Sequence, residues 1–234
     1  MSTSHVTYET EPPLATLTFN RPEARNAMTW EMYQALVDAC ERVDQDPDIR
    51  VLILRGAGGK AFVAGTDIAQ FANFSGPEDG LGYERRIDEV LDRLERVTKT
   101  TIAQVQGVAA GGGCAIALTC DLRVATPDST FGIPIARTLG NCLSGATYGR
   151  MVDLLGPSRV KDLLMTGRFI DSAEAHAFGL VNRSIDKWFS VPVDEIFRAS
   201  NEMNQQWLSE HDNMVRTILT QLGKDVPEDL EATR

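Results

Sequence analysis

Residues 106–126 read QGVAAGGGCAIALTCDLRVAT, and this stretch decides the fold. Three glycines open an apolar segment that carries no charge before Asp121, which predicts a short buried helix. The runs on either side of it, TIAQVQG (101–107) and DLRVAT (121–126), have the composition of buried strands. A strand, a helix and a second strand in this order predict an α/β unit.

The glycines at the start of the helix allow three interpretations. A helix N-terminus presents unpaired N–H groups and a partial positive charge, and glycine lets another group approach that backbone closely. Such a place can serve tight helix–strand packing, phosphate binding or an oxyanion hole. Phosphate binding is disfavoured, because GGGCAIAL matches neither GxxxxGK[ST] nor the GxGxxG fingerprint with its later acidic residue. Tight helix–strand packing and an oxyanion hole both remain as interpretations of the glycines.

A second glycine-containing loop favours the oxyanion hole. Residues 60–71, KAFVAGTDIAQF, follow the buried strand VLILRG (51–56) and enter a short helix that Asp67 is placed to cap. Two loops of this kind, after two buried strands, could supply two N–H donors to one carbonyl oxygen.

The rest of the chain continues the alternation of strands and helices. Residues 75–82 are rich in glycine and acidic residues, which predicts a mobile loop, and residues 83–97 form an amphipathic helix. Thr29 is expected to cap a helix over 30–45. This alternation predicts an α/β core with right-handed crossovers. The other expected elements are a hairpin over 6–11 and 14–20 and helices over 142–155, 157–166, 172–178 and much of 193–222.

Composition narrows the classes of function. The chain has 234 residues and a net charge of −10, which argues against nucleic acid and anionic membranes as partners. The polar, acidic N-terminal stretch does not resemble a signal peptide, and no apolar run approaches the ~20 residues of a membrane span, so we expect a cytoplasmic protein. No metal site is expected, because neither the histidines nor the cysteines cluster; they are His5, His176, His211, Cys40, Cys114, Cys120 and Cys142.

Four stretches resemble the crotonase (enoyl-CoA hydratase/isomerase) superfamily and occur in that family's order. The resemblance implies a spiral of ββα units over residues 1–183, followed by a helical trimerisation segment over 184–234. It also implies a homotrimer or a dimer of trimers. The four stretches are LTFNRPEARNAMT (17–29), VLILRGAGGKAFVAGTDIAQF (51–71), QGVAAGGGCAIALTCDLRVAT (106–126) and DSAEAHAFGLVNR (171–183).

The resemblance also implies a substrate class and a set of site residues. Members act on acyl-CoA thioesters, so coenzyme A would enter as part of the substrate and no separate cofactor is expected. The oxyanion hole would use the backbone N–H groups of Thr66 and Gly112. Arg25 could contact a phosphate of coenzyme A, or it could be an ordinary solvated arginine. The positions that match the CoA-binding segment are Ala24, Arg25, Ala64, Asp67 and Ile68.

The positions where the family keeps its acidic catalysts hold apolar residues in this chain. The two glutamates of hydratases correspond to Ala115 and Ile135, and the aspartate of some isomerases and dehalogenases corresponds to Leu143. Alkyl side chains can neither orient water nor carry a proton, so standard hydration is not expected.

Other polar residues are candidates for the missing acid or base. Asp88 falls near an active-site position of the dehalogenase branch, although an i,i+4 surface charge near Glu84 is the simpler interpretation. Cys142 has no visible partner base, and Asn141 is better explained as a helix cap than as a catalyst.

Three hypotheses about function follow. We favour an enzyme that stabilises a thioester enolate, for example in isomerisation, decarboxylation or thioester hydrolysis. The alternative is a catalytically inactive homologue that binds acyl-CoA. A nucleotide-dependent oxidoreductase is the weakest hypothesis, because the dinucleotide fingerprint is missing.

Overall fold

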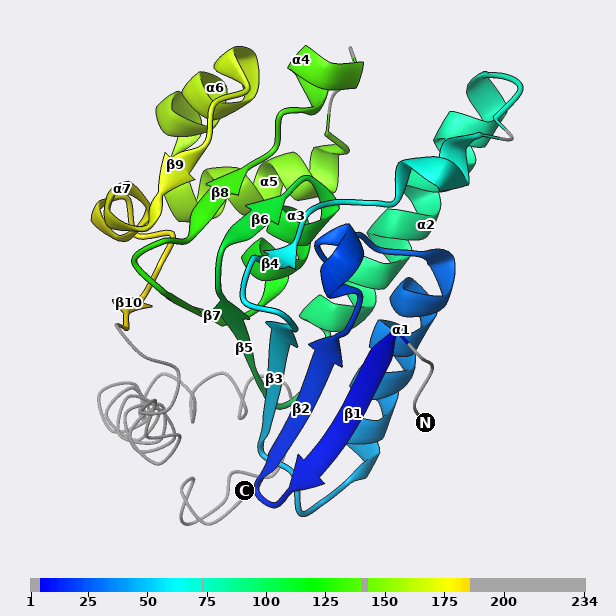
Figure 1. The fold of residues 1–234 in the computed structure, drawn as a ribbon, viewed down its shortest axis with the longest axis vertical. Coiled ribbons are helices and arrows are strands. Elements are labelled where there is room, and N and C mark those ends of the chain that lie inside the picture. The colour runs from blue at the N-terminus through cyan, green and yellow to red at the C-terminus, as the bar shows by residue number, and fades with distance from the viewer. Residues whose placement is uncertain (1–4, 73, 140–142, 186–234) are drawn as a thin grey trace, which may run out of the picture. The chain divides into compact units, whose positions relative to one another are not determined.

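The computed structural model describes residues 5–72, 74–139 and 143–185. Its strands form two sheets, a larger one with the order β1-β2-β3-β5-β7-β10 and a smaller one with the order β4-β6-β8-β9 (Figure 1). The larger sheet consists of β1 (Val6–Glu11), β2 (Leu14–Phe19), β3 (Val51–Gly56), β5 (Thr100–Val105), β7 (Leu122–Ala125) and β10 (Arg183–Ser184). The smaller sheet consists of β4 (Ala61–Val63), β6 (Val108–Ala110), β8 (Thr130–Gly132) and β9 (Ile170–Asp171).

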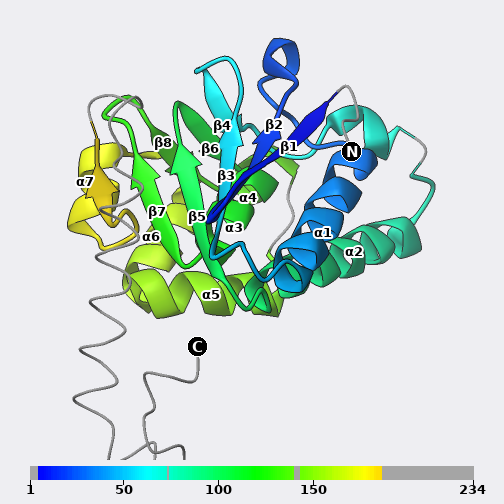
Figure 2. The ribbon, with the colours of Figure 1, turned by 90° about the horizontal axis from the view of Figure 1, so that it is seen from below.

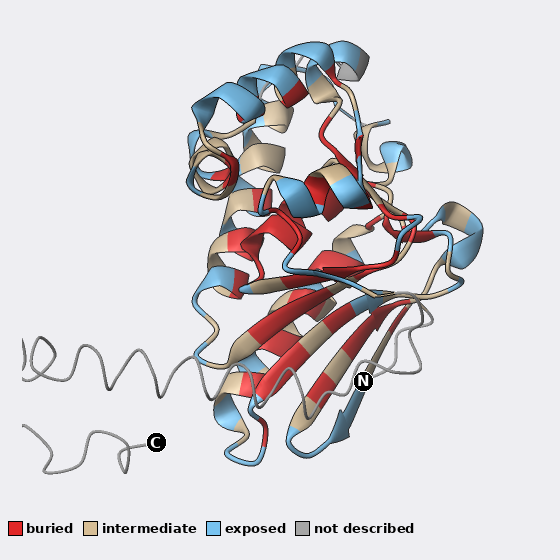
Figure 3. Cartoon of the chain, turned by 90° about the vertical axis from the view of Figure 1, so that its left-hand side faces the viewer, coloured by how far each residue is buried: buried red, intermediate tan, exposed pale blue. Residues whose placement is uncertain are grey.

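The helices pack against these sheets. Helix α1 contacts β1, β2 and β3, and α2 lies beside it (Figure 2). Buried residues gather where helices and strands face each other (Figure 3). The helices are α1 (Trp30–Gln45), α2 (Pro77–Glu95), α3 (Gly112–Thr119), α4 (Ile135–Leu139), α5 (Gly145–Leu155), α6 (Pro157–Thr166) and α7 (Ser172–Ala177), with short 3-10 turns η1 (Pro22–Ala24) and η2 (Ile68–Phe71).

Three consecutive segments follow the same path. In each, the first strand joins the larger sheet, the second joins the smaller sheet, and a helix then returns the chain. The segments are β3-β4-α2, β5-β6-α3 and β7-β8-α4/α5, and equivalent strands pair in parallel within their sheets. The predicted α/β spiral of ββα units is therefore confirmed.

Local signals predicted several elements correctly and missed others. Thr29 caps α1 by accepting a hydrogen bond from the Met32 N–H. The loop predicted over 75–82 is wrong, because α2 already begins at Pro77, a residue whose fixed φ suits the first helical turn. The Asp79 carboxylate accepts from the N–H groups of Ser75 and Gly76 and holds this start. The short strands β6, β9 and β10 were not predicted, and the helix predicted over 193–222 lies outside the described residues.

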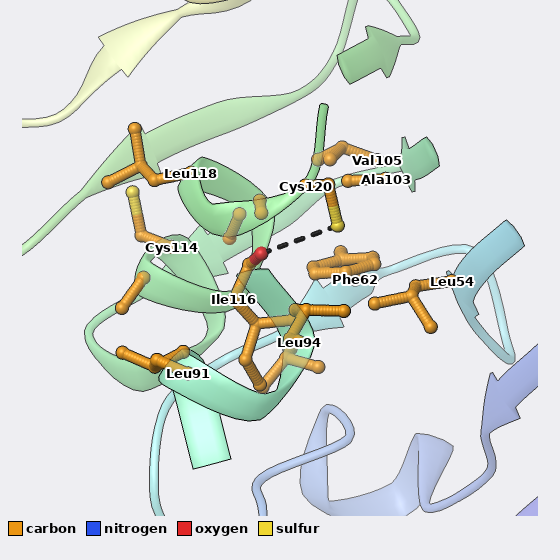
Figure 4. Close-up of a cluster of buried hydrophobic side chains, with 14 of the residues drawn as sticks. Leu54, Phe62, Leu91, Leu94, Ala103, Val105, Cys114, Ile116, Leu118 and Cys120 are labelled. Carbon is orange, nitrogen blue, oxygen red and sulfur yellow. Dashed lines mark hydrogen bonds between the residues drawn. The ribbon is translucent and has the colours of Figure 1, made fainter. Parts of the chain in front are cut away.

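Helix α3 lies in the core of the described residues. Every residue from Gly113 to Thr119 is buried. Figure 4 shows its side chains among those of β3, β4, α2 and β5, including Phe62, Leu91, Leu94 and Val105. A helix that is apolar on all sides has no face for solvent, so its position is fixed by packing from every direction.

Two glycines of the triplet, Gly111 and Gly113, satisfy different requirements. Gly111 has a φ of 51°, which an L side chain rarely adopts. A methyl group on Gly113 would overlap the Val63 carbonyl oxygen and lie 2.6 Å from the Val63 Cβ atom. The close approach of α3 to β4 therefore depends on the absence of a side chain at Gly113.

Arg123, in β7, closes the other end of the helix. Its side chain is buried, and its guanidinium donates to backbone carbonyls of Ala117, Leu118 and Cys120 at the end of α3. The Nε atom also donates to the Leu180 carbonyl at 2.6 Å. A cation at a helix C-terminus compensates the partial negative charge there, so Arg123 both satisfies carbonyls and stabilises α3.

We predict that Gly113→Ala destabilises the fold by at least about 3 kcal/mol or prevents folding, because its Cβ atom meets backbone that cannot move aside. Gly149→Ala is the matched control: Gly149 lies inside α5 with open space around a Cβ atom, so we expect a gain of up to about 1 kcal/mol. Urea denaturation followed by circular dichroism measures both. Equal stability of the two variants would contradict the packing argument.

We predict that Arg123→Met lowers the free energy of unfolding by at least about 3 kcal/mol, because several buried carbonyls lose their donor. The control is Arg55→Met, which removes a guanidinium from a side chain that is 45% exposed and is expected to change stability by less than about 1 kcal/mol. The same denaturation experiment checks both, and a loss at position 123 no larger than that at position 55 would refute the role given to Arg123.

Candidate functional site

The two glycine-containing loops meet at the N-terminus of α3. A methyl group built on Gly112 would lie 3.3 Å from the Thr66 Oγ1 atom and 3.9 Å from the Thr66 N atom. The two residues predicted to form an oxyanion hole are therefore direct neighbours, although they come from loops after β4 and after β6.

A parallel bridge between Met28 and Thr66 orients one of the two N–H groups. The Met28 N–H donates to the Gly65 carbonyl at 2.8 Å, and the Asp67 N–H donates to the Met28 carbonyl at 2.9 Å. In a parallel bridge of this kind the N–H of the residue between the two bonds, here Thr66, points away from the partner strand. Within the described parts of the chain, this N–H makes no hydrogen bond.

A hydrogen bond from Gly111, which anchors the glycine triplet, orients the N–H group of Gly112. The Gly111 N–H donates to the Gly132 carbonyl of β8 at 2.9 Å, which fixes the entry to α3. Gly112 is the first residue of the helix, so its N–H has no partner within the helix, and among the described residues it has none elsewhere. Two free N–H groups beside each other at a helix N-terminus suit an oxygen atom that becomes negative.

Two tyrosines lie against these donors. The Thr66 Oγ1 atom is 2.8 Å from the Tyr33 hydroxyl and 2.8 Å from the Tyr83 hydroxyl. A methyl group on Gly112 would lie 2.7 Å from the Tyr33 hydroxyl, so this chain of three hydroxyls borders the pair of N–H groups. Burial raises the pKa of both phenols, so both keep their protons at ordinary pH.

Aromatic rings hold the two phenols in place. The Trp30 ring centroid is 5.8 Å from that of Tyr33 and 5.8 Å from that of Tyr83. Phe71 packs edge-on against Tyr83 at 5.0 Å, and Phe74 lies 6.4 Å from it. The Tyr83 side chain thus has a fixed orientation between η2 and α1. Sequence reasoning missed both tyrosines, because neither lies in a glycine loop and no spacing links α1 to α2.

The predicted CoA-binding positions form one structural unit next to the site. The Ala64 N–H donates to the Arg25 carbonyl at 3.1 Å, which ties the loop after β2 to the loop after β4. Ala24 lies beside Arg25 in the turn η1, and the side chains of Arg25 and Ile68 are exposed.

Asp67 has partners of its own within this unit. Its carboxylate accepts from the Ala69 N–H at 3.0 Å and from the Arg21 guanidinium at 2.9 Å, which confirms the predicted cap. These hydrogen bonds lower the pKa of Asp67, with the bond from Ala69 contributing most. Its carboxylate therefore supports the loop.

Asp88 is not the i,i+4 surface charge that we considered the simpler interpretation. It is half-buried, and its Oδ1 atom accepts from the Ser144 hydroxyl at 2.7 Å. Ser144 also caps α5, so the interpretation of Asn141 as the cap of that helix is wrong. Asn141 and Cys142 themselves lie outside the described residues.

The three apolar positions lie close to the triplet or to α2. The Ala115 N–H donates to the Gly111 carbonyl at 3.0 Å, and its side chain is buried. Ile135 opens α4, three residues after the Gly132 carbonyl that anchors Gly111, and Leu143 precedes Ser144. Ile135 and Leu143 are half-buried and pack against the core.

Cysteine and metal chemistry find no support in the described residues. Cys40, Cys114 and Cys120 are buried free thiols, and burial raises the pKa of Cys114 to about 12. Across residues 5–72, 74–139 and 143–185 no three potential ligands gather to hold a metal ion. The helices of these same ranges are too short or too polar to cross a membrane.

Comparison with known proteins agrees with this architecture. The family model described as enoyl-CoA hydratase/isomerase matches residues 9–234. A crotonyl-CoA hydratase of Syntrophomonas wolfei is 38% identical over 185 residues, which are 79% of this chain and 70% of that protein. The enoyl-CoA hydratase EchA19 of Mycobacterium tuberculosis is 42% identical over 173 residues, 72% of this chain and 64% of that protein.

A solved structure shares the fold over nearly the whole chain. An enoyl-CoA hydratase/isomerase family protein from Hyphomonas neptunium superposes with a TM-score of 0.78 at 29% identity, covering 97% of this chain and 86% of that one. The order of the ββα units, the paired glycine loops and these matches lead to one conclusion. The chain belongs to the enoyl-CoA hydratase/isomerase, or crotonase, family.

Proposed function

We propose that this protein is an enzyme that acts on acyl-CoA thioesters and stabilises a thioester enolate between the N–H groups of Thr66 and Gly112. The observation that carries the proposal is the contact between these two residues, whose N–H groups make no other hydrogen bond in the described part of the chain. One such donor typically contributes a factor of about 10²–10³ to kcat.

We infer that coenzyme A lies over the unit formed by Ala24, Arg25, Ala64, Asp67 and Ile68. The exposed Arg25 guanidinium would meet a phosphate, and the backbone near Ala64 and Ile68 would meet the adenine. The names of the relatives, which are hydratases of crotonyl-CoA and other enoyl-CoA thioesters, support this substrate class. A homotrimer or a dimer of trimers in the cytoplasm remains part of the proposal.

We infer further that the reaction is not the addition of water. Ala115, Ile135 and Leu143 stand where a hydratase or isomerase would carry an acid. Ala115 is buried in the core, and Ile135 and Leu143 pack against the core. Such surroundings exclude ordered water but strengthen electrostatic interactions with the two N–H donors.

The experiment that tests the proposal is a mass-spectrometric screen of the full-length protein with saturated, enoyl, β-keto, malonyl-type and aryl CoA thioesters. We expect one class to be converted and Gly112→Ala to lower its turnover at least about 100-fold, because the new methyl group fills the space between Gly112 and Thr66. Gly149→Ala should keep the wild-type rate. Failure of every CoA thioester to bind would refute the proposal.

A catalytically inactive acyl-CoA-binding protein is the second candidate. It is favoured by the same three apolar residues, since an enzyme without an acid or base would bind its ligand and release it unchanged. Tight binding of thioesters without conversion of any of them would establish this candidate in place of the first.

We predict that the double variant Ala115→Glu/Ile135→Glu gains measurable hydration of crotonyl-CoA, because it restores two carboxylates beside an oxyanion hole. Loss of the crotonyl-CoA absorbance measures this activity. The control is Ala115→Gln/Ile135→Gln, which has the same size but cannot exchange protons and should stay inactive. Equal activity of the two double variants would show that the missing carboxylates are not the reason why the wild-type protein does not hydrate crotonyl-CoA.

A further inference from the structure

The hydroxyl chain Tyr33–Thr66–Tyr83 lies where the site needs a proton carrier. The Thr66 Oγ1 atom is only three covalent bonds from the Thr66 N atom that would bind the thioester oxygen. The Tyr83 hydroxyl is 2.8 Å from that Oγ1 atom, and the Tyr33 hydroxyl is 2.8 Å away on its other side. The Tyr83 hydroxyl therefore lies next to the residue whose N–H would bind the thioester oxygen.

A count of protons shows that the hydroxyl chain Tyr33–Thr66–Tyr83 has one proton available for donation. Three hydroxyl groups carry three protons, and the two hydrogen bonds between them use two. When Tyr33 donates to Thr66 and Thr66 donates to Tyr83, the proton of Tyr83 is free to be donated elsewhere. Tyr33 is fully buried and Tyr83 is only half-buried, so the open end of the chain is Tyr83.

We propose that the Tyr83 hydroxyl is the proton donor of this site and that it protonates the enolate left when a malonyl-type CoA thioester loses carbon dioxide. The inference rests on the proposed function, because it needs the thioester oxygen between the Thr66 and Gly112 N–H groups.

The chemistry of a phenol decides the direction of proton transfer. The raised pKa of Tyr83 keeps it protonated, so it can give a proton but does not take one from a substrate. A carbon next to a thioester is a much weaker acid than a phenol, so transfer from Tyr83 to an enolate carbon runs downhill. Loss of carbon dioxide produces an enolate without removing a proton from carbon, so it needs no base.

The apolar residues favour the same reaction. A carboxylate placed among alkyl groups such as Ala115 and Ile135 loses its hydration, which disfavours the charged ground state. The charge moves onto the thioester oxygen as the carbon–carbon bond breaks, and two N–H donors stabilise it there. Apolar surroundings that disfavour hydration therefore favour decarboxylation.

The step balances without any further reactant. The bond between the α-carbon and the carboxylate breaks, carbon dioxide leaves, and the electron pair forms the enolate. The α-carbon then takes the proton of Tyr83, and the phenolate accepts a hydrogen bond from the Thr66 hydroxyl. Tyr83 regains a proton from water, and the hydroxide combines with carbon dioxide to give bicarbonate.

The test follows methylmalonyl-CoA incubated with the full-length protein in D2O. We expect wild-type protein to form propionyl-CoA that carries deuterium at C2 in one configuration. Tyr83→Phe should lower kcat at least about 100-fold, bind the thioester within about threefold of wild type, and leave its residual product racemic at C2. Tyr8→Phe is the matched control, because it removes a hydroxyl from β1 and should keep both rate and configuration.

A second variant separates proton donation from positioning. Tyr33→Phe removes the hydroxyl at the buried end of the hydroxyl chain. We expect it to lower kcat by a smaller factor than Tyr83→Phe does, while the product keeps one configuration. Loss of configuration in Tyr33→Phe but not in Tyr83→Phe would overturn the assignment to Tyr83. A rate for Tyr83→Phe within about threefold of wild type would overturn it as well.

The outcomes also distinguish this inference from the proposed function. If methylmalonyl-CoA binds without losing carbon dioxide while another thioester class is converted, the inference fails and the proposed function stands. If no CoA thioester binds at all, both fail.

Discussion

The contact between Gly113 and Val63 is the constraint on which the site depends. Because Gly113 has no side chain, the first turn of α3 can rest directly on the end of β4. The strand β4 leads into the loop that carries Thr66, so this contact sets how far Thr66 lies from the start of the helix. An added methyl group at this point would separate the two N–H donors as well as loosen the core.

The site combines polar groups that donate with surroundings that exclude water. Its donors are backbone N–H groups and a row of hydroxyls, none of which changes charge at ordinary pH. Its neighbours are alkyl and aromatic side chains, which make every dipole in the site more effective. An arrangement of this kind is better suited to stabilising a charge that forms during a reaction than to binding a charge that is present beforehand.

Sequence reasoning predicted the parts of the molecule that depend on local signals. The cap at Thr29, the buried strands and both glycine loops follow from residues close to each other in the chain. Strand β6 was missed because three residues carry too little periodicity, and the start of α2 was missed because glycines hid the Pro77 signal. Tyr33 and Tyr83 could not be predicted, since only tertiary packing brings α1 and α2 to Thr66.

The contacts of Arg123 allow the residues around it to vary in sequence. Among the described residues its side chain donates only to backbone carbonyls, those at and just after the end of α3 and that of Leu180. Every amino acid offers a carbonyl, so each neighbour can be exchanged during evolution without removing an acceptor, whereas the arginine has no substitute with the same reach and number of donors. One residue that cannot vary thus permits variation in the positions that surround it.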